Sequence, residues 1–308
     1  MRLTPIKAAA LGAIAVGVAT PLLRRRLKIP PPVVTATAAA VPVAISVLTP
    51  RTRARDVAIC AGQMWAYLAT YQMPNDDPDE LERRVKIDYP VTFDRAIGGG
   101  ELPSVRIQRA FAKHGEVRFP ERVLVWSHWV WFAFPHGTAA YILARHPERF
   151  PRAALLTYSV FDLGLVGYWG IPTAPPWYAA KHGRLHSDDG PPLRRMMVEH
   201  GERFWKDRWE PLYGVLGGNP LAAMPSLHFA TSLMAAHLLA ELGPVEGAIG
   251  WTYALTLGFA LIYLGEHYVI DLLAGAALTE GIRAAAPALT PLVRAISDAL
   301  SGLEARAA

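Results

Sequence analysis

The sequence predicts an all-α protein: a polytopic bundle of membrane helices with a six-helix core and an additional N-terminal helical pair. Of its 308 residues, 52% are hydrophobic and only 19% are charged, whereas soluble domains have about a quarter charged residues. The hydrophobic residues gather into windows long enough to cross a hydrocarbon core of roughly 30 Å. Such segments must be helical, because lipid cannot satisfy exposed backbone N–H and C=O groups.

The hydrophobic windows fall into a short N-terminal pair and a longer core set. The pair, 8–23 and 33–48, is rich in Ala and Val, and we interpret it as an uncleaved helical hairpin because no obvious cleavage site follows its first window. The core windows are 55–71, 123–143, 153–174, 226–242, 247–264 and 268–286. Buried helices of a large soluble protein are the alternative, which the length and number of the windows disfavour.

We predict three parts along the chain. A transmembrane hairpin covers residues 1–50, the main membrane domain, which holds the core windows, covers 51–290, and a C-terminal tail covers 291–308. From Pro287 on, we expect a short amphipathic helix. Within the first long polar stretch, Leu102 to His114 fits either an amphipathic helix on the membrane surface or a solvated loop.

Composition excludes several classes of function. The single cysteine, Cys60, rules out a disulfide framework or a thiolate metal site within one chain. The net charge of +5 does not indicate nucleic acid binding, because the basic residues lie mainly between the hydrophobic windows, where anionic lipid headgroups would meet them. We therefore predict membrane lipids as partners and no nucleic acid, and make no prediction of oligomeric state.

Two short motifs carry the candidate chemistry. Met224–Ala230 reads MPSLHFA, and Tyr263–Asp271 reads YLGEHYVID. Each places a histidine at the start of a hydrophobic window, and ionisable groups at membrane depth are functional candidates by default. The chain crosses the membrane twice between His228 and His267, so both reach the same face. His267 and Asp271 are four residues apart and share one side of a helix.

This combination suits covalent phosphoryl transfer. A carboxylate at Asp271 fixes the tautomer of His267 and leaves its other nitrogen free to attack phosphorus. His228 then protonates the leaving oxygen, and the phosphohistidine passes to water or an alcohol. Ser226 and the N–H groups at the helix start would hold phosphate oxygens. Neither a metal nor another cofactor is required. For any one histidine alone, a hydrogen-bonded core residue is the simpler interpretation.

Both motifs resemble signature motifs of the type 2 phosphatidic acid phosphatase superfamily. Asn219–Met224, which leads into the first motif, and the proline-rich Pro172–Tyr178 are similar to the branch that contains inositol phosphorylceramide synthase. The resemblance covers about residues 98–277. It implies a six-helix phosphatidic acid phosphatase-like core, with His267 as nucleophile, Asp271 as its partner and His228 as acid.

The sequence also departs from the family's usual pattern. Phosphatases of the superfamily usually carry an arginine six residues before the nucleophile, where this chain has Leu261. Their upstream lysine–arginine–proline motif is not recognisable either, and the synthase branch relaxes both features. Other basic residues must then bind phosphate, and we predict Lys181 and Arg184 for this role. Further candidates are Arg194, Arg195, Arg203, Lys206 and Arg208.

Four other polar residues lie near the motifs or in the windows. Asp162 is either a functional carboxylate or the partner of a basic side chain inside the bundle. His128 and His136 are expected to be packing or interfacial residues. Glu266, beside the nucleophile, either tunes its pKa, steers an alcohol acceptor or is a simple headgroup-level carboxylate.

Short basic loops predict the orientation. Arg51, Arg53 and Arg55 precede one core window, and Arg145, Arg149 and Arg152 lie between the next two, on the same side; this side should be cytoplasmic. The motif histidines then face outward from an integral membrane protein, which we place in the plasma membrane. The basic cluster Arg24–Lys28 conflicts with this orientation if both N-terminal windows span.

The leading functional hypothesis is a membrane lipid phosphatase or phosphotransferase that acts on a lipid-linked phosphate through a phosphohistidine. One alternative is an inositol-phosphate-type transferase to a lipid acceptor, which shares this chemistry. Another is a non-catalytic membrane protein that retained the fold, although the His–His–Asp set argues against it. A metal-dependent hydrolase would need more ligands than these residues supply.

Overall fold

The computed structural model describes residues 4–113, 115–185, 193–216 and 219–307. Across these ranges the structure is predominantly helical, and the only β-type pairings are isolated bridges that join Thr173 to Lys86 and to Ala222. This confirms the predicted all-α class. The chain packs as two compact units, one formed by residues up to Asp76 together with those from Arg283 on, the other by Asp77–Ile282. The predicted functional boundaries at residues 50 and 290 stay predictions.

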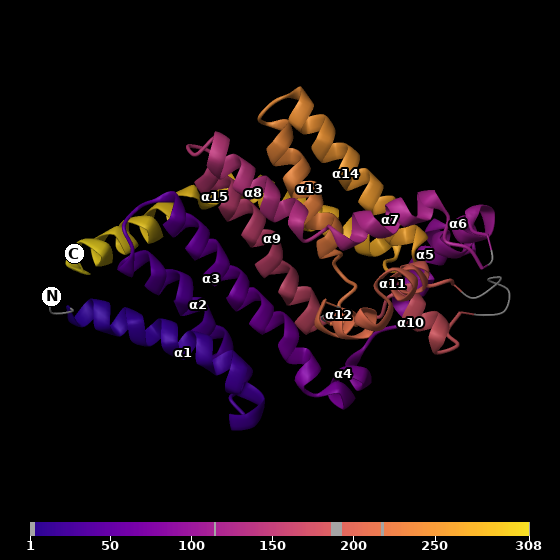
Figure 1. Ribbon diagram of the computed structural model, residues 1–308, viewed down its shortest axis with the longest axis horizontal. Helices are drawn as coiled ribbons and strands as arrows, with labels where there is room; N and C mark the ends of the chain where they lie inside the picture. The colour runs from indigo at the N-terminus through magenta and orange to yellow at the C-terminus, as the bar shows by residue number, and fades with distance from the viewer. Residues whose placement is uncertain (1–3, 114, 186–192, 217–218, 308) are drawn as a thin grey trace. The chain divides into compact units, whose positions relative to one another are not determined.

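The first unit begins with three consecutive helices that pack on one another in turn (Figure 1). They are α1 (Pro5–Leu27), α2 (Pro31–Leu48) and α3 (Arg53–Gln72), and the short 3-10 helix η1 (Met73–Asp76) follows. Gly17 allows α1 and α2 to approach closely, since a Cβ there would lie 2.4 Å from the carbonyl oxygen of Thr37. Arg24 and Arg25 each lie 2.6 Å from Asp76, so the basic cluster at the C-terminal end of α1 is partly neutralised.

The second unit contains both motifs. Its helices are α4 (Pro78–Arg84), α5 (Asp88–Ile97), α6 (Pro103–Phe111), α7 (Phe119–Trp129), α8 (Ala133–Arg145), α9 (Phe150–Gly170), α10 (Pro176–Lys181), α11 (Met196–Trp205), η3 (Lys206–Arg208), α12 (Trp209–Leu216), α13 (Leu227–Ala240), α14 (Pro244–Tyr263) and the first part of α15 (Val269–Ala307). Helices α13 and α14 form a hairpin, with α8 and α9 against α13 and α7 against α14 (Figure 1). Helix α6 covers most of the segment from Leu102 to His114 that was predicted to be either an amphipathic helix or a loop. The last residue of that segment, His114, lies outside the described residues.

The predicted window 123–143 is broken where a single helix was expected. Helix α7 ends at Trp129, a turn covers 130–132, and α8 starts at Ala133. Pro135 explains the break, because a proline lacks the N–H that would bond to the carbonyl of Trp131 and its ring would clash with that carbonyl. The carbonyl of Trp131 instead accepts from the N–H of Phe134 at 3.0 Å. The break places His128 in the last turn of α7 and Trp131 in the turn that follows, rather than both in the middle of a membrane span.

The predicted C-terminal tail is also different. Instead of a separate short helix after Pro287, α15 continues without interruption to Ala307. Its last turns belong to the first unit, where Glu304 pairs with Arg51 at 3.0 Å and also with Arg55.

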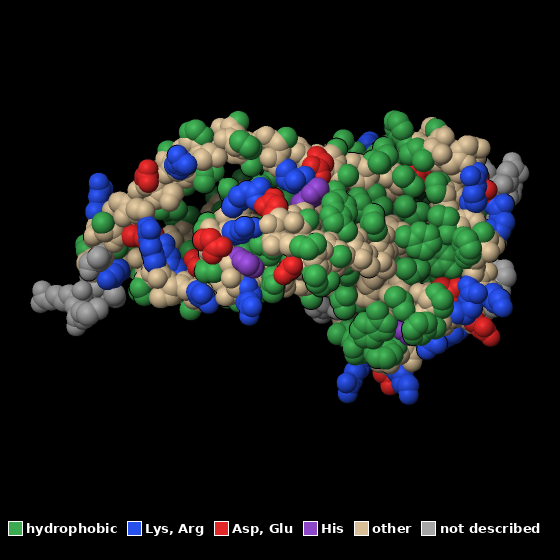
Figure 2. All heavy atoms as spheres, turned by 90° about the horizontal axis from the view of Figure 1, so that it is seen from above, with side chains coloured by type: hydrophobic (Ala, Val, Ile, Leu, Met, Phe, Trp, Pro, Cys, Tyr) green, Lys and Arg blue, Asp and Glu red, His purple; other side chains and the backbone are tan. Residues whose placement is uncertain are grey.

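The helices carry the surface of a membrane protein. By length and composition, α1, α2 and α14 are apolar enough to cross a membrane, and α13 is apolar but shorter. Large hydrophobic side chains are exposed along α14, among them Ile249, Leu255 and Phe259. Figure 2 shows hydrophobic side chains over much of the face in view. Because exposed apolar surface of this extent is expected against lipid, the chain is an integral membrane protein.

Candidate active site

The first motif lies in the turn that enters α13. Ser226 is the N-cap of this helix: its hydroxyl accepts from the N–H of Phe229 at 3.3 Å, and its own N–H donates to the carbonyl of Asp271 at 3.0 Å. A serine at this position satisfies an N–H that the helix itself cannot. The motif therefore places His228 in the first turn of α13 and ties that turn directly to the start of α15.

Glycines on the neighbouring helices allow this turn to be surrounded closely. A Cβ at Gly164 or Gly167 of α9 would meet the side chain of Leu227 at 2.4 Å or that of Pro225 at 2.5 Å. A Cβ at Gly275 of α15 would lie 2.6 Å from the carbonyl oxygen of Ser226. The last contact is with backbone and has little room to adjust, so α15 can carry the second motif past the first only with glycine there.

The second motif reverses the chain between α14 and α15. Gly265 has φ +73°, in the left-handed region that glycine adopts without strain. The carbonyl of Leu261 then accepts from the N–H groups of both Glu266 and His267, at 3.0 and 3.1 Å. This turn delivers His267 at the N-terminus of α15, directly opposite the first turn of α13.

The three predicted catalytic side chains meet at this point. Nδ1 of His267 lies 3.2 Å from Oδ2 of Asp271, and Nε2 of His267 lies 3.2 Å from Nδ1 of His228. His267 is 3% exposed and Asp271 is fully buried. Asp271 also accepts from the N–H of Tyr268 at 2.9 Å, which holds its carboxylate in place. A proton on Nδ1 of His267 is therefore directed to the carboxylate, and Nε2 carries the lone pair that faces His228.

The two histidines touch directly, with no room for a phosphorus atom between them. An attacking nitrogen about 3 Å from phosphorus, and an acid nitrogen within a hydrogen bond of the leaving oxygen beyond it, require a separation of roughly 6 Å. Substrate must therefore part His228 from His267 before reaction. Within the described ranges, no group of three or more His, Cys, Asp and Glu side chains has the arrangement of a metal site.

A further carboxylate, which the sequence did not single out, fixes the start of α15. Asp94 on α5 accepts from the N–H groups of Val269 and Ile270 at 2.9 and 3.0 Å, and it is 1% exposed. Burial raises the pKa of this carboxyl to about 6. The interaction joins residues about 175 positions apart, so no local pattern could have revealed it.

The predicted phosphate-binding residues have different surroundings. Ser226 is fully buried and its hydroxyl is engaged in capping. Lys181 and Arg184 are exposed at the end of α10 and just after it, and Arg184 lies 3.8 Å from Asp88. Their predicted contact with phosphate stays a prediction.

Arg195, one of the further candidates, lies closer to the second motif. Its guanidinium carbon is 3.9 Å above the ring of Trp177, and its Nη2 donates to the hydroxyl of Tyr213 at 2.9 Å. Trp177 in turn donates its backbone N–H to the carbonyl of Gly265 at 3.2 Å, and its side chain lies close to Glu266. Burial raises the pKa of Glu266, and the charge of Arg195 and the side chain of Trp177 oppose that rise.

This arrangement leaves polar atoms without partners near His267. Nε of Arg195 and Oε1 of Glu266 are both buried and have no hydrogen-bond partner among the described residues. The proline-rich element around Trp177 therefore brings a cation, a carboxylate and an aromatic face next to His267.

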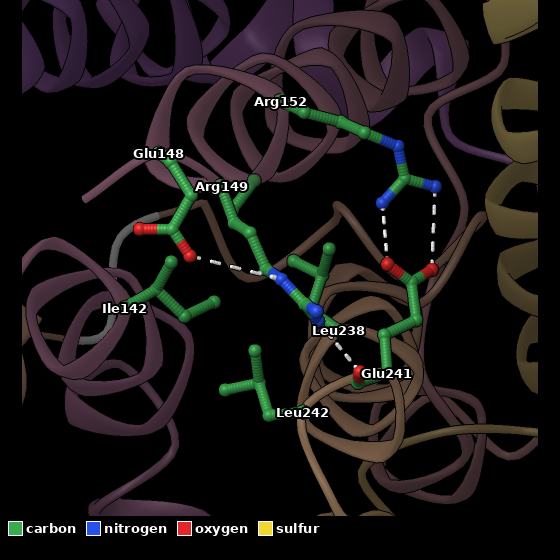
Figure 3. Close-up of a pocket in the computed structure, with 8 residues that line it drawn as sticks. Ile142, Glu148, Arg149, Arg152, Leu238, Glu241 and Leu242 are labelled. Atoms are coloured by element: carbon green, nitrogen blue, oxygen red, sulfur yellow. Dashed lines mark hydrogen bonds and ion pairs between the residues drawn. The ribbon is translucent and has the colours of Figure 1, made fainter. Parts of the chain in front are cut away.

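A cavity without any of these residues lies elsewhere in the second unit. It has a volume of about 340 Å³ and sits at the far end of α13 from His228, between the α8–α9 turn and the end of α13 (Figure 3). Arg152 pairs with Glu241 at 2.6 Å, and Arg149 donates to the carbonyl of Glu241 at 2.6 Å. Its arginines are thus already occupied, and the described residues that line it include no histidine. We do not assign the reaction to this cavity.

Comparisons with known proteins show the family of the chain. The family model of the PAP2 superfamily matches residues 92–285, a range that includes both motifs and Asp94. The chain is 30% identical over 166 residues to an inositol phosphorylceramide synthase of Candida albicans, which covers 51% of this chain and 34% of that protein. It is 29% identical over 150 residues to a phosphoinositol dihydroceramide synthase of Bacteroides thetaiotaomicron, which covers 48% of each.

A third relative is the inositol phosphorylceramide synthase catalytic subunit aur1 of Schizosaccharomyces pombe, 26% identical over 161 residues, 49% of this chain and 37% of that protein. The chain thus spans between about a third and a half of the length of these curated relatives. No solved structure matches the chain. The resemblance predicted from the motifs is confirmed by the family match.

Proposed function

The chain belongs to the PAP2 superfamily, and we propose that it is a membrane enzyme that transfers the phosphate of a lipid-linked substrate through a phosphohistidine intermediate. The observation that carries this proposal is the continuous line of contacts from Asp271 to His267 to His228, each of 3.2 Å. It supplies an oriented nucleophile and a proton donor within one buried site, as nucleophilic catalysis requires.

In the first step, Nε2 of His267 attacks phosphorus while Nδ1–H stays hydrogen-bonded to Asp271. The bond from phosphorus to the leaving oxygen breaks, and His228 gives that oxygen its proton. Asp271 stabilises the positive charge that develops on His267, because an opposite charge within hydrogen-bond distance favours the charged imidazole.

In the second step, the neutral His228 takes a proton from an incoming hydroxyl group. The hydroxyl oxygen attacks phosphorus, the bond to Nε2 breaks, and His267 returns to its neutral form. Water as the acceptor gives hydrolysis, and an alcohol gives transfer. Burial of His267 favours an alcohol that arrives with the lipid, since bulk water has poor access to a residue that is 3% exposed.

A transferase that moves a phosphorylated polyol to a lipid acceptor is the more specific form of this proposal. It is favoured by the relatives, which are named inositol phosphorylceramide synthases and a phosphoinositol dihydroceramide synthase. The set formed by Arg195, Glu266 and Trp177 suits such a headgroup, because a guanidinium binds phosphate, a carboxylate accepts from hydroxyl groups and an aromatic face covers a ring. Lys181 and Arg184 remain alternative phosphate contacts nearer the surface.

We further place the enzyme in the plasma membrane with His228 and His267 facing outward. The short basic loop around Arg149 supports this orientation, and the pairing of Arg24 and Arg25 with Asp76 weakens the conflict from the basic cluster at the end of α1. A cysteine introduced near Arg184 should then react with an impermeant thiol reagent on intact cells, and one near Glu148 should not. The reverse labelling would turn the site to the cytoplasm.

The experiment that tests the function uses purified enzyme in detergent and lipids labelled at phosphorus. A lipid phosphomonoester and a polyol-bearing lipid phosphodiester are each supplied with and without an alcohol-bearing lipid acceptor. Hydrolysis releases labelled inorganic phosphate from the monoester and labelled polyol phosphate from the diester, whereas label on the acceptor indicates transfer. Acid-labile label on the protein, absent from His267→Ala, is expected in both cases. Folded wild-type enzyme that neither turns over nor becomes labelled with any of these lipids would refute the proposal.

A further inference from the structure

A third imidazole lies against the reaction site. The ring of His128, on the last turn of α7, is 4.8 Å from the ring of His228 between centroids, and the two planes differ by only 26°. The ring of His228 is in turn 5.3 Å from that of His267. A side chain expected to serve in packing is therefore next to the proton donor.

The stacked geometry restricts what His128 can do. The nitrogens of an imidazole donate and accept in the plane of the ring, so two nearly parallel stacked rings do not share a hydrogen bond. His128 is thus not a direct proton relay to His228. Its Nδ1 is buried and has no hydrogen-bond partner in the part of the chain that the structure describes.

Packing alone does not account for a histidine here. A buried nitrogen without a partner costs about 1–3 kcal/mol, and a hydrocarbon ring would stack on His228 without that cost. Trp131 illustrates the difference: it lies 4.1 Å from the same imidazole, and its indole N–H donates to the hydroxyl of Thr231 at 2.9 Å. Of these two neighbours of His228, only His128 leaves a nitrogen for a group that the protein does not supply.

Substrate binding creates the access that this nitrogen lacks. A phosphoryl group must part His228 from His267 by several ångströms, and movement of the His228 ring would uncover the His128 ring that is stacked on it. We propose that His128 is a substrate-binding residue whose Nδ1–H donates to a phosphoryl oxygen held between His228 and His267. This inference rests on the proposed function and adds a residue to it. A neutral imidazole makes this contact without placing a second positive charge beside protonated His228.

Three substitutions separate hydrogen bonding from packing. His128→Phe keeps a ring against His228 and removes both nitrogens. His128→Asn places an amide near the position of Nδ1, whereas His128→Gln places it near that of Nε2. The matched control is His136→Phe, since His136 on α8 also has a buried nitrogen without a partner but stacks on Phe161, at 5.5 Å and 6°.

We expect kcat/KM of His128→Phe to fall roughly ten- to a hundredfold, the loss of one hydrogen bond to a charged oxygen. Inhibition by orthovanadate, which resembles five-coordinate phosphorus, should weaken by a similar factor. If His128→Phe loses a hundredfold in kcat/KM, the kcat/KM of His128→Asn should be at least tenfold higher than that of His128→Phe, and that of His128→Gln should not. His136→Phe should keep kcat/KM within about threefold of wild type.

Wild-type kcat/KM and vanadate inhibition in His128→Phe would overturn the inference. Equal losses in His128→Phe and His128→Asn, with a lower melting temperature than His136→Phe, would also overturn it and indicate a packing role. Wild-type enzyme is measured in parallel, so its inactivity would refute the proposed function itself and is distinguishable from failure of the His128 variants alone.

Discussion

Removing the Asp94 carboxylate should disable the site from a distance. Asp94 contacts neither His267 nor His228, but it holds the first two N–H groups of α15, at 2.9 and 3.0 Å. Asp94→Ala leaves both groups buried without an acceptor, at a cost of about 1–3 kcal/mol each. The first turn of α15 also carries Asp271. A displacement of about 1 Å there should lower kcat roughly a hundredfold.

The buried charge of Asp94 affects stability in the opposite direction to its hydrogen bonds. Burial raises the pKa of Asp94 from 3.8 to about 6, so keeping this carboxyl ionised at pH 7 costs up to about 3 kcal/mol relative to the unfolded chain. Because the folded pKa is the higher one, the folded protein binds more protons between these values. Its free energy of unfolding should fall as pH rises from about 4 to about 6, and then level off.

Asp94→Asn separates the two effects. It keeps one acceptor oxygen for α15 and removes the buried charge, so at pH 7 we expect stability close to or above wild type and kcat between wild type and Asp94→Ala. The decline in stability between pH 4 and 6 should become smaller in this variant. Asp88→Ala is the matched control, because Asp88 lies on the same helix, is 78% exposed and sits 3.8 Å from Arg184.

The assay combines thermal unfolding in detergent from pH 4 to 7.5 with kcat at pH 7. Asp94→Ala with wild-type kcat, or with no greater effect than Asp88→Ala, would refute the positioning role. Identical pH dependence of stability in wild type and Asp94→Asn would refute the assignment of that dependence to Asp94.

Three further predictions follow from the site. His267→Ala should lose all turnover while staying folded. His228→Ala should regain activity with an acyl-bearing aryl phosphate, because general acid catalysis contributes roughly a hundred- to ten-thousandfold only when the leaving group is poor. Rescue of the His267 variant instead would mean that the two roles are exchanged. Gly275→Ala should lower the melting temperature markedly, because its Cβ would lie 2.6 Å from the carbonyl of Ser226, whereas Gly281→Ala on the same helix meets nothing within 4 Å; equal melting temperatures would contradict this. Activity should survive EDTA, because two imidazoles and a carboxylate suffice for this chemistry, and loss restored by a divalent ion would favour a metal-dependent mechanism.

Features encoded by local spacing could be predicted from the sequence. The hydrophobic windows predicted an all-α membrane protein. The spacing of four residues between His267 and Asp271 predicted their contact, although His267 lies just before α15, which begins at Val269, and not on the helix itself. Convergence of His228 with His267 followed from counting crossings, since α13 and α14 form a hairpin that returns the chain to the same face. Each of these inferences depends on helix geometry alone.

Features that depend on pairing between distant segments could not be predicted. Asp94 and α15 are joined only through the packed structure, and so are Arg195 and Trp177. The sequence gives each of these residues an ordinary polar or aromatic setting, and only the fold shows that their partners lie beside the nucleophile. His128 is a similar case, because its neighbour in space is a hundred residues away.

The break in the window 123–143 could have been predicted from the sequence, but the prediction was based on hydrophobic composition instead. Pro135 lies inside the window 123–143, and proline inside a helix removes a hydrogen bond to the preceding turn. Hydrophobicity alone made the window continuous, whereas the missing N–H breaks it at 130–132. The break matters to function, since it places His128 and Trp131 where they can contact His228.

The N–H groups at the N-terminus of α15 are not available to bind a phosphate. A helix start attracts anions because its N–H groups lack partners. At α15 those groups are already used: Asp94 accepts from Val269 and Ile270, and Asp271 accepts from Tyr268. This helix start therefore stabilises its own carboxylates, and with them the charge that develops on His267. Stabilisation of the phosphoryl oxygens must then come from other groups, which leaves the start of α13, Arg195 and His128 as the donors that variants should test first.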